Sequence, residues 1–139
     1  MKLYAVIDTN VLVSAMLKWS SVPGSILEFA FSGIITPVLS EKIVAEYREV
    51  LMRKKFHLTE DIVEDIISIL DEQGEYIDPG SMEYELPDPK DVVFYAVIME
   101  KRKDEDAYLV TGNTKHFPVK PFVVTPREML DIILGKDNK

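Results

Sequence analysis

The sequence contains no cysteine, and only two of its 139 residues are histidine. The absence of cysteine excludes disulfide bonds, zinc–thiolate sites and thiol catalysis. Long apolar runs are absent as well. The apolar stretch after Lys2 ends at Asp8, which does not fit a signal peptide, and the run 92–99 is too short to cross a bilayer. We therefore expect a soluble, cytoplasmic protein.

Positive charge is also scarce, because 16 lysine and arginine residues stand against 24 aspartate and glutamate residues, for a formal net charge of −8. This balance argues against broad, nonspecific binding to nucleic acid, which depends on neutralising phosphates. It does not exclude a nuclease, since metal ions held by carboxylates carry their own positive charge. The basic clusters 53–55 and 101–103 each close a helical pattern, and we interpret them as solvated helix ends, where cations suit the helix dipole.

The length and the 47% hydrophobic content fit one domain, residues 1–139, with a single core. Strands are predicted at 3–7, 34–38, 107–111 and 122–125, with a short one at 76–77, and helices at 10–19, 25–31, 41–54, 60–72, 91–102 and 126–134. Residues 78–89 are rich in turn-forming residues. Strands that alternate with helices predict an α/β fold with a mainly parallel sheet.

An aspartate closes the first predicted strand. Residues 3–7 are apolar without polar alternation, which is typical of a strand covered on both faces in a parallel sheet. Ligands of such sheets bind at the carboxyl ends of the strands, where Asp8 falls. A carboxylate there loses water and needs a cation or several hydrogen-bond donors to stay ionised.

A second acid lies on the helix predicted for 41–54. At about 100° per residue, its apolar side chains form one stripe: Ile43, Val44, Tyr47, Val50 and Leu51. Glu46 lies at the edge of this stripe. It either points along the edge of the sheet or is a partly exposed boundary residue.

Two further segments bring polar side chains to places where a site could form. Asp88 precedes Pro89 and is either a helix cap or an additional site acid, whereas Asp91 leads directly into a helix that is apolar almost all round. Asn113 follows the strand 107–111 and a glycine, and it either favours a turn or offers a neutral oxygen ligand. Acidic oxygens without cysteine suit Mg²⁺ or Mn²⁺, ions that can activate water against a phosphodiester.

Four of these segments, in this order and spacing, resemble the successive motifs of PIN domains. The segments are 7–15, 40–51 with Glu46, 86–91 and 109–113. Each motif alone is weak, but four in order are specific. The nearest branch is the VapC-like group of toxins from toxin–antitoxin systems. The resemblance implies a three-layer α/β/α sandwich and a metal-dependent endoribonuclease.

The resemblance also assigns positions in this chain. It implies that Asp8, Glu46 and Asp91 are catalytic metal ligands and that Asp88 is an extra acid. Family members often carry an aspartate where this chain has Asn113, and the change removes one negative charge. It puts a second metal ion in question. The resemblance further implies a homodimer and inhibition by a small antitoxin protein.

Supporting roles follow for neighbouring residues. The resemblance implies that Asn10 either holds Asp8 in place or reaches the metal through water, and Thr9 belongs to the same motif. Thr111, at the end of the strand predicted for 107–111, is expected to orient a metal ligand in a similar way. Lys115 and His116 are candidates for contact with RNA phosphate, although a surface or loop-packing role for His57 and His116 is the simpler interpretation.

The resulting hypothesis is hydrolysis of an RNA phosphodiester by an Mg²⁺- or Mn²⁺-dependent enzyme. One alternative is a PIN-like module that binds RNA or protein without cutting, which Asn113 favours. Another is a metal-dependent phosphatase or DNA nuclease that uses the same carboxylates. A phosphatase with a nucleophilic aspartate would need a second acid two residues after Asp8, where Asn10 stands.

Overall fold

A parallel β-sheet organises the chain in the computed structural model, which describes residues 2–135. The strands are β1 (Leu3–Ile7), β2 (Ile35–Leu39), β3 (Glu75–Tyr76), β4 (Ala107–Val110) and β5 (Val123–Val124). Their spatial order is β3-β2-β1-β4-β5, and every neighbouring pair is parallel. The predicted α/β fold with a mainly parallel sheet is therefore confirmed.

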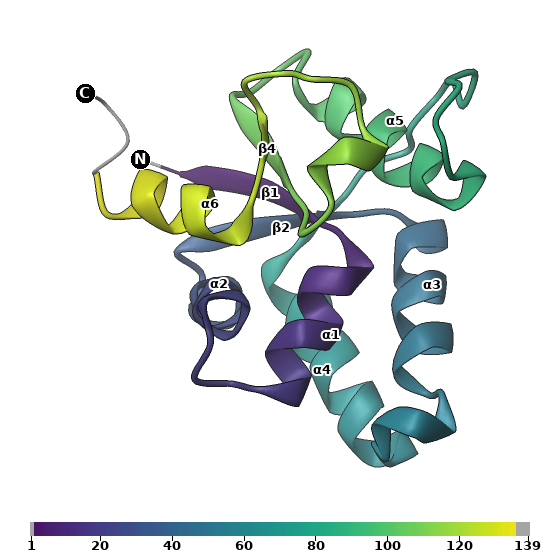
Figure 1. Ribbon diagram of the computed structural model, residues 1–139, viewed down its shortest axis with the longest axis vertical. Helices are drawn as coiled ribbons and strands as arrows, with labels where there is room; N and C mark the ends of the chain where they lie inside the picture. Colours follow the sequence, from purple (N-terminus) through teal and green to yellow (C-terminus); the bar gives the residue numbers. More distant parts are fainter. Residues whose placement is uncertain (1, 136–139) are drawn as a thin grey trace.

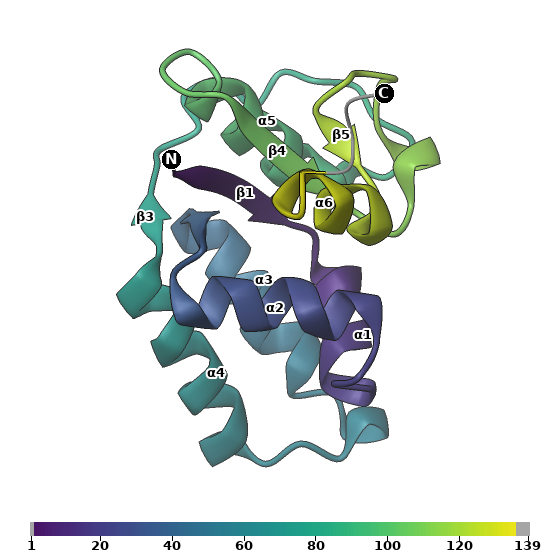
Figure 2. The ribbon, with the colours of Figure 1, turned by 90° about the vertical axis from the view of Figure 1, so that its left-hand side faces the viewer.

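Helices cover both faces of this sheet. They are α1 (Thr9–Leu17), α2 (Val22–Ser32), α3 (Glu41–Leu51), α4 (Glu60–Gln73), α5 (Val92–Lys101) and α6 (Pro126–Ile133). Figure 2 shows α5 on one side of the sheet and α2 and α4 on the other, and α5 contacts β1, β2 and β4. Helix α6 packs against α2, β4 and β5. The arrangement is the three-layer α/β/α sandwich.

The core explains why β1 has no polar alternation. Its residues from Tyr4 to Ile7 are all buried, because α5 lies on one face and α2 on the other. Helix α5 is buried around most of its circumference for the same reason. None of the helices between residues 2 and 135 has the length and apolar character needed to cross a bilayer.

Two helix boundaries differ from the prediction by three residues. Helix α2 begins at Val22 rather than at residue 25, because the Ser21 side chain accepts a hydrogen bond from the Gly24 amide and Pro23 fits the first turn. Helix α3 ends at Leu51, and the short 3-10 helix η1 (Lys54–Phe56) follows it. Arg53 consequently lies in a connection between helices.

The interpretation of residues 101–103 as a solvated helix end is wrong for Lys101. Its side chain is buried, its Nζ lies 2.5 Å from Glu75 Oε1, and it lies 4.0 Å from the centroid of the Tyr4 ring. The ammonium therefore has a carboxylate and an aromatic face as partners. It joins the end of α5 to β3 and β1.

Four helical segments begin at or near the carboxyl edge of the sheet. Helix α1 follows β1 after Asp8 and α3 follows β2 after Ser40, and these two helices pack against each other. The 3-10 helix η2 (Pro89–Asp91) leads into α5 nearby, and the 3-10 helix η3 (Thr114–His116) follows β4. This edge is where the predicted acids should meet.

Candidate metal centre

A cavity of about 500 Å³ opens at the carboxyl edge of the sheet. Five acids line it: Asp8, Glu46, Glu49, Asp88 and Asp91. Asn10, Asn113, His116, Lys90 and Arg53 are also in its wall, together with residues of α1 and α3. The cavity thus collects side chains from β1, α3, η2 and η3, which are far apart in the sequence.

Asp8 lies at the floor of this cavity. Its amide continues the sheet by donating to Val110 O at 2.9 Å, and its carbonyl accepts the amide of Val11 in the first turn of α1. Asp8 is the N-cap residue of α1, yet its side chain makes no capping hydrogen bond. The carboxylate is therefore directed to other partners.

Two side chains hold the carboxylate of Asp8. Thr111 Oγ1 donates to Oδ2 at 2.8 Å, and Asn10 Nδ2 donates to the same oxygen at 3.3 Å. The Asn10 Oδ1 in turn accepts the amide of Gly112 at 3.1 Å. Asn10 thereby ties the turn after β4 to the acid at the end of β1.

The pKa of Asp8 is raised from 3.8 to about 6. Burial is the largest cause, and the negative charges of Asp91 and Glu46 add to it, while the hydrogen bond from Thr111 opposes them. The ionised carboxylate therefore lacks enough compensating positive charge from the protein itself.

Glu46 comes to the cavity from α3, where it is half-buried. Thr9 Oγ1 donates to Glu46 Oε2 at 2.8 Å, which ties the start of α1 to α3. The next residue, Tyr47, is buried, and its hydroxyl donates to Ile7 O at 2.5 Å. Burial raises the pKa of Tyr47, so this hydroxyl remains a donor. The two contacts fix α3 against the end of β1.

Asp88 precedes η2 and Asp91 is its last residue, and the two side chains have different partners. Asp88 caps η2, because its Oδ1 accepts the amide of Lys90 at 3.0 Å. Asp91 is the N-cap residue of α5 but makes no capping hydrogen bond from its side chain. Its Oδ2 instead lies 3.1 Å from His116 Nδ1. Burial and the neighbouring charge of Asp88 raise the pKa of Asp91, and His116 opposes the rise.

The loop after β4 supplies two more polar groups. The Asn113 amide donates from its backbone to Thr111 Oγ1 at 3.0 Å, and its side-chain nitrogen lies 3.0 Å from His116 Nε2. The 3-10 helix η3, which the sequence pattern did not predict, turns His116 into the cavity. Lys115 is exposed on the same turn and is not among the lining residues.

Two cations in the wall were not predicted as site residues. Arg53 reaches the cavity from the connection after α3, where its guanidinium pairs with Glu49 at 3.3 Å. Lys90 lies between Asp88 and Asp91. No local signal distinguishes either residue from an ordinary surface cation, because their placement depends on how α3 and η2 meet across the sheet edge.

The donor set fits a divalent cation. Ligand atoms of Asp88, Asp91 and His116 all lie within 4.8 Å of one another. Asp8 and Glu46 line the same cavity, and the raised pKa of Asp8 indicates unbalanced negative charge. Carboxylate oxygens with few cationic partners are the ligands that Mg²⁺ and Mn²⁺ prefer.

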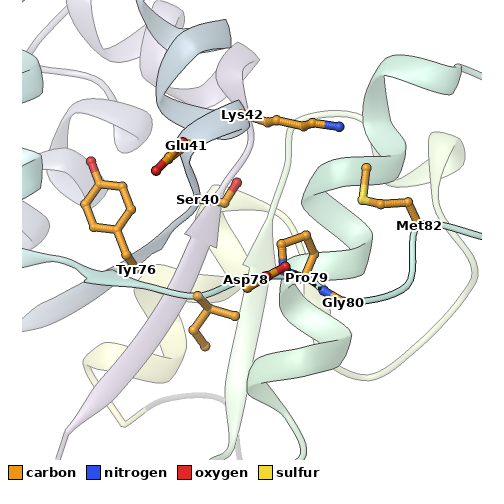
Figure 3. Close-up of a pocket in the computed structure, with 9 residues that line it drawn as sticks. Ser40, Glu41, Lys42, Tyr76, Asp78, Pro79, Gly80 and Met82 are labelled. Atoms are coloured by element: carbon orange, nitrogen blue, oxygen red, sulfur yellow. Dashed lines mark hydrogen bonds between the residues drawn. The ribbon is translucent and has the colours of Figure 1, made fainter.

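A second cavity, of about 470 Å³, lies beside the ends of β2 and β3 and the start of α3. Figure 3 shows Tyr76 and Met82 at opposite ends of this cavity, with Glu41, Lys42 and Asp78 between them. The Asp78 carboxylate accepts the amide of Gly80 at 3.0 Å and so stabilises a turn. The two cavities share no lining residue.

Comparison with known proteins identifies the fold. Among solved structures, VapBC2 from Rickettsia felis, in a crystal structure with a DNA fragment from its promoter, superposes with a TM-score of 0.59. The sequences are 18% identical, and the match covers 88% of this chain and 97% of that chain. No curated protein sequence matches. The family described as the PIN domain matches residues 4–115. This match begins within β1, ends within η3 and includes all the acids of the cavity, and the chain therefore belongs to the PIN domain family.

Proposed function

We propose that the protein is an endoribonuclease that depends on Mg²⁺ or Mn²⁺ and hydrolyses RNA phosphodiester bonds. The observation that carries the proposal is the convergence of Asp8, Glu46, Asp88 and Asp91 on one cavity at the carboxyl edge of a parallel sheet. Membership of the PIN domain family supports it.

The residues that would hold the ion are Asp8, Glu46 and Asp91, with Asp88 and Asn113 as additional oxygen ligands. When bound, a divalent ion supplies positive charge to a phosphodiester and lowers the pKa of water. No side chain is assigned as a general base.

The surrounding residues keep these ligands in place before substrate arrives. Thr111 and Asn10 hold Asp8, and Thr9 holds Glu46. Such outer contacts fix the orientation of a ligand carboxylate and reduce what must be reorganised during the reaction. Arg53 and Lys90 supply the positive charge that draws RNA phosphates to a strongly acidic cavity.

We also propose a cytoplasmic toxin, paired with a small antitoxin protein and acting as a homodimer. The VapC-like motifs support this role, and VapBC2 shares the fold. A short adjacent reading frame encoding a DNA-binding protein would support the pairing. Growth should stop when the chain is expressed alone and resume when that neighbour is expressed with it. Unimpaired growth at verified expression would contradict the toxin role but not the nuclease.

The second candidate is a PIN-like module that binds RNA or protein without cutting. Asn113 favours it, because an amide at this place contributes no charge toward a second ion. The two candidates differ in one measurable property, which is cleavage.

The decisive assay offers single-stranded RNA, single-stranded DNA and a small phosphate ester, each with Mn²⁺, Mg²⁺ or chelator. We expect RNA cleavage that needs metal and falls at least about 100-fold in Asp8→Asn, since ligand loss removes much of the charge stabilisation. Glu46→Gln and Asp91→Asn should behave alike. Asp104→Asn, an exposed acid outside the cavity, is the matched control.

Cleavage that persists in Asp8→Asn would show that the site is assigned wrongly. Absence of cleavage with RNA and either metal would favour the binding module, provided that the wild-type chain binds RNA in a filter or gel-shift assay. Preferential hydrolysis of DNA or of the small ester would replace RNA as the substrate class.

A further inference from the structure

His116 is placed where a metal ligand would be useful. It enters the cavity from η3, and its side chain is 40% exposed, so one edge of the ring faces solvent. Its Nδ1 lies 3.1 Å from Asp91 Oδ2, and its Nε2 lies 3.0 Å from Asn113 Nδ2. Asn113 Nδ2 also lies 3.4 Å from Nδ1, so it is near both ring nitrogens. In a neutral imidazole one of the two nitrogens carries a lone pair and can ligate a cation.

The neighbours of His116 complete a set of three donors. Ligand atoms of His116, Asp91 and Asp88 lie within 4.8 Å of one another. One oxygen of Asp88 caps η2 by accepting the Lys90 amide. A carboxylate has two oxygens, so capping does not use up its capacity as a ligand. The three residues come from η2 and η3, which meet only in the fold.

This set differs in chemistry from the remaining acids of the cavity. Asp8 and Glu46 offer oxygen only, whereas His116 offers nitrogen. Asp91 belongs to both groups. Its negative charge raises the pKa of Asp8, and its Oδ2 contacts His116. At Asn113 the chain has an uncharged amide beside the ring. The imidazole of His116 therefore lies next to Asn113, the position at which family members often carry a charged aspartate.

We infer that His116, Asp88 and Asp91 form a second cation position with mixed nitrogen and oxygen ligands, which selects a transition metal such as Mn²⁺ over Mg²⁺. Imidazole nitrogen is a common ligand of transition metals, whereas Mg²⁺ takes oxygen ligands and keeps its waters. The inference rests on the proposed function only in taking a divalent ion at this cavity. To the proposed function it adds His116 as a metal ligand and a preference for Mn²⁺ over Mg²⁺.

The test is a binding measurement that involves no RNA. Mn²⁺ is added to the chain, purified without a histidine tag, and pulsed electron paramagnetic resonance records coupling between the ion and a directly bound nitrogen. The chain has only two histidines. His116→Asn keeps a nitrogen that can donate to Asp91 but removes the imidazole ligand. His57→Asn is the matched control, because His57 is exposed and lies outside the cavity.

We expect imidazole nitrogen coupling in the wild type and in His57→Asn, and its loss in His116→Asn. Mn²⁺ affinity at this position should fall about tenfold or more in His116→Asn. Mg²⁺, measured by competition, should bind the wild type and His116→Asn almost equally.

Bound Mn²⁺ without imidazole coupling in the wild type would overturn the inference, as would coupling that survives His116→Asn. Either result leaves the proposed nuclease standing if RNA is cleaved and Asp8→Asn abolishes cleavage. Conversely, imidazole coupling in a chain that cuts no RNA would sustain the metal position and defeat the proposed function.

Discussion

At the scale of single residues, Asp8 carries the strongest physical signature of the site. It is 5% exposed, and its pKa is raised to about 6. Burial of a charge that the protein does not fully compensate destabilises the folded state. A bound cation would supply the missing positive charge. The buried carboxylate of Asp8 would then be a cost to stability that the function requires.

Asp8→Asn should stabilise the metal-free protein at pH 7. With about 1.4 kcal/mol per pKa unit, a rise from 3.8 to about 6 gives an upper limit of about 3 kcal/mol. Below pH 3.8 the carboxyl is protonated in both states and contributes nothing. As the pH rises toward 6, the unfolded chain releases the proton first, so the wild type loses stability. Urea unfolding in chelator at pH 4 and pH 7 measures this difference.

The same experiment has an internal control and a contrary outcome. Asp104→Asn, at an exposed position, should change the free energy of unfolding little at either pH. Adding Mn²⁺ should stabilise the wild type more than Asp8→Asn, which lacks the Asp8 ligand but keeps the position at His116. If Asp8→Asn is less stable than the wild type at pH 7 in chelator, Asp8 is not a destabilising charge.

Substitution of Arg53 tests how this acidic protein binds the negatively charged phosphates of RNA. Its guanidinium lines the cavity and pairs with Glu49, both at the surface. We expect Arg53→Ala to raise KM for RNA several-fold with little change in kcat, because the contact is to phosphate rather than to reacting atoms. The salt dependence of kcat/KM should weaken by about 0.7 in the log–log slope.

Lys54→Ala is the matched control for this prediction, since Lys54 is the next residue but does not line the cavity. It should affect KM and the salt slope much less. Equal effects of the two substitutions would mean that only the general charge of this turn matters.

At the scale of elements, α3 positions the site through one hydroxyl. Tyr47 donates to Ile7 O, directly before Asp8. Tyr47→Phe should lower the free energy of unfolding by about 1–2 kcal/mol, because a buried acceptor loses its donor. It should also lower kcat, since the end of β1 is then less firmly held. Tyr108→Phe, on a half-buried ring in β4, should have neither effect. Unchanged stability of Tyr47→Phe would contradict this role.

The junction of α5 with β3 and β1 depends on a buried lysine. Removing Glu75 leaves Lys101 with only the Tyr4 ring as a partner. We expect Glu75→Ala to destabilise the fold by about 1–3 kcal/mol, because the ammonium stays buried without its carboxylate. Lys101→Met should be tolerated better, since it removes the charge and keeps the volume. Chemical unfolding of both variants ranks them, and the reverse order would refute the argument.

Local signals predicted those elements whose burial is uniform or strictly periodic. The uninterrupted run of β1 predicted a strand covered on both faces and an acid at its carboxyl end. The stripe of α3 placed Glu46 at the core boundary. The start of α2 was predicted at residue 25, three residues too late. Proline in the first turn and Ser21 before it are in fact signals for the start of a helix.

At the scale of the whole molecule, the placement of some site and core residues could not be predicted from the sequence around them. His116 was interpreted mainly as a surface or loop-packing residue, and no local signal predicted that η3 turns it toward Asp91. Lys101 was interpreted as part of a solvated helix end, but Glu75 and Tyr4, from other elements, contact its ammonium. In each case the partner lies 25 residues or more away in the sequence. Such partners come together only when the sheet order is fixed.

The fold as a whole brings the acids of three separate segments to one edge of the sheet. Strands β2, β1 and β4 run parallel, so their carboxyl ends lie at the same side of the molecule. The charge of the cavity is strongly negative there. In the function proposed above, both catalysis and the preference between metals depend on the binding of a divalent ion at this edge.

The most direct measurement is an anomalous difference map from a crystal of the wild-type chain soaked in Mn²⁺. We predict a peak inside the cavity, within bonding distance of the carboxylates of Asp8 and Asp91, and no such peak in Asp8→Asn. An empty cavity in well-ordered wild-type crystals, or Mn²⁺ bound only by residues outside it, would contradict the central claim.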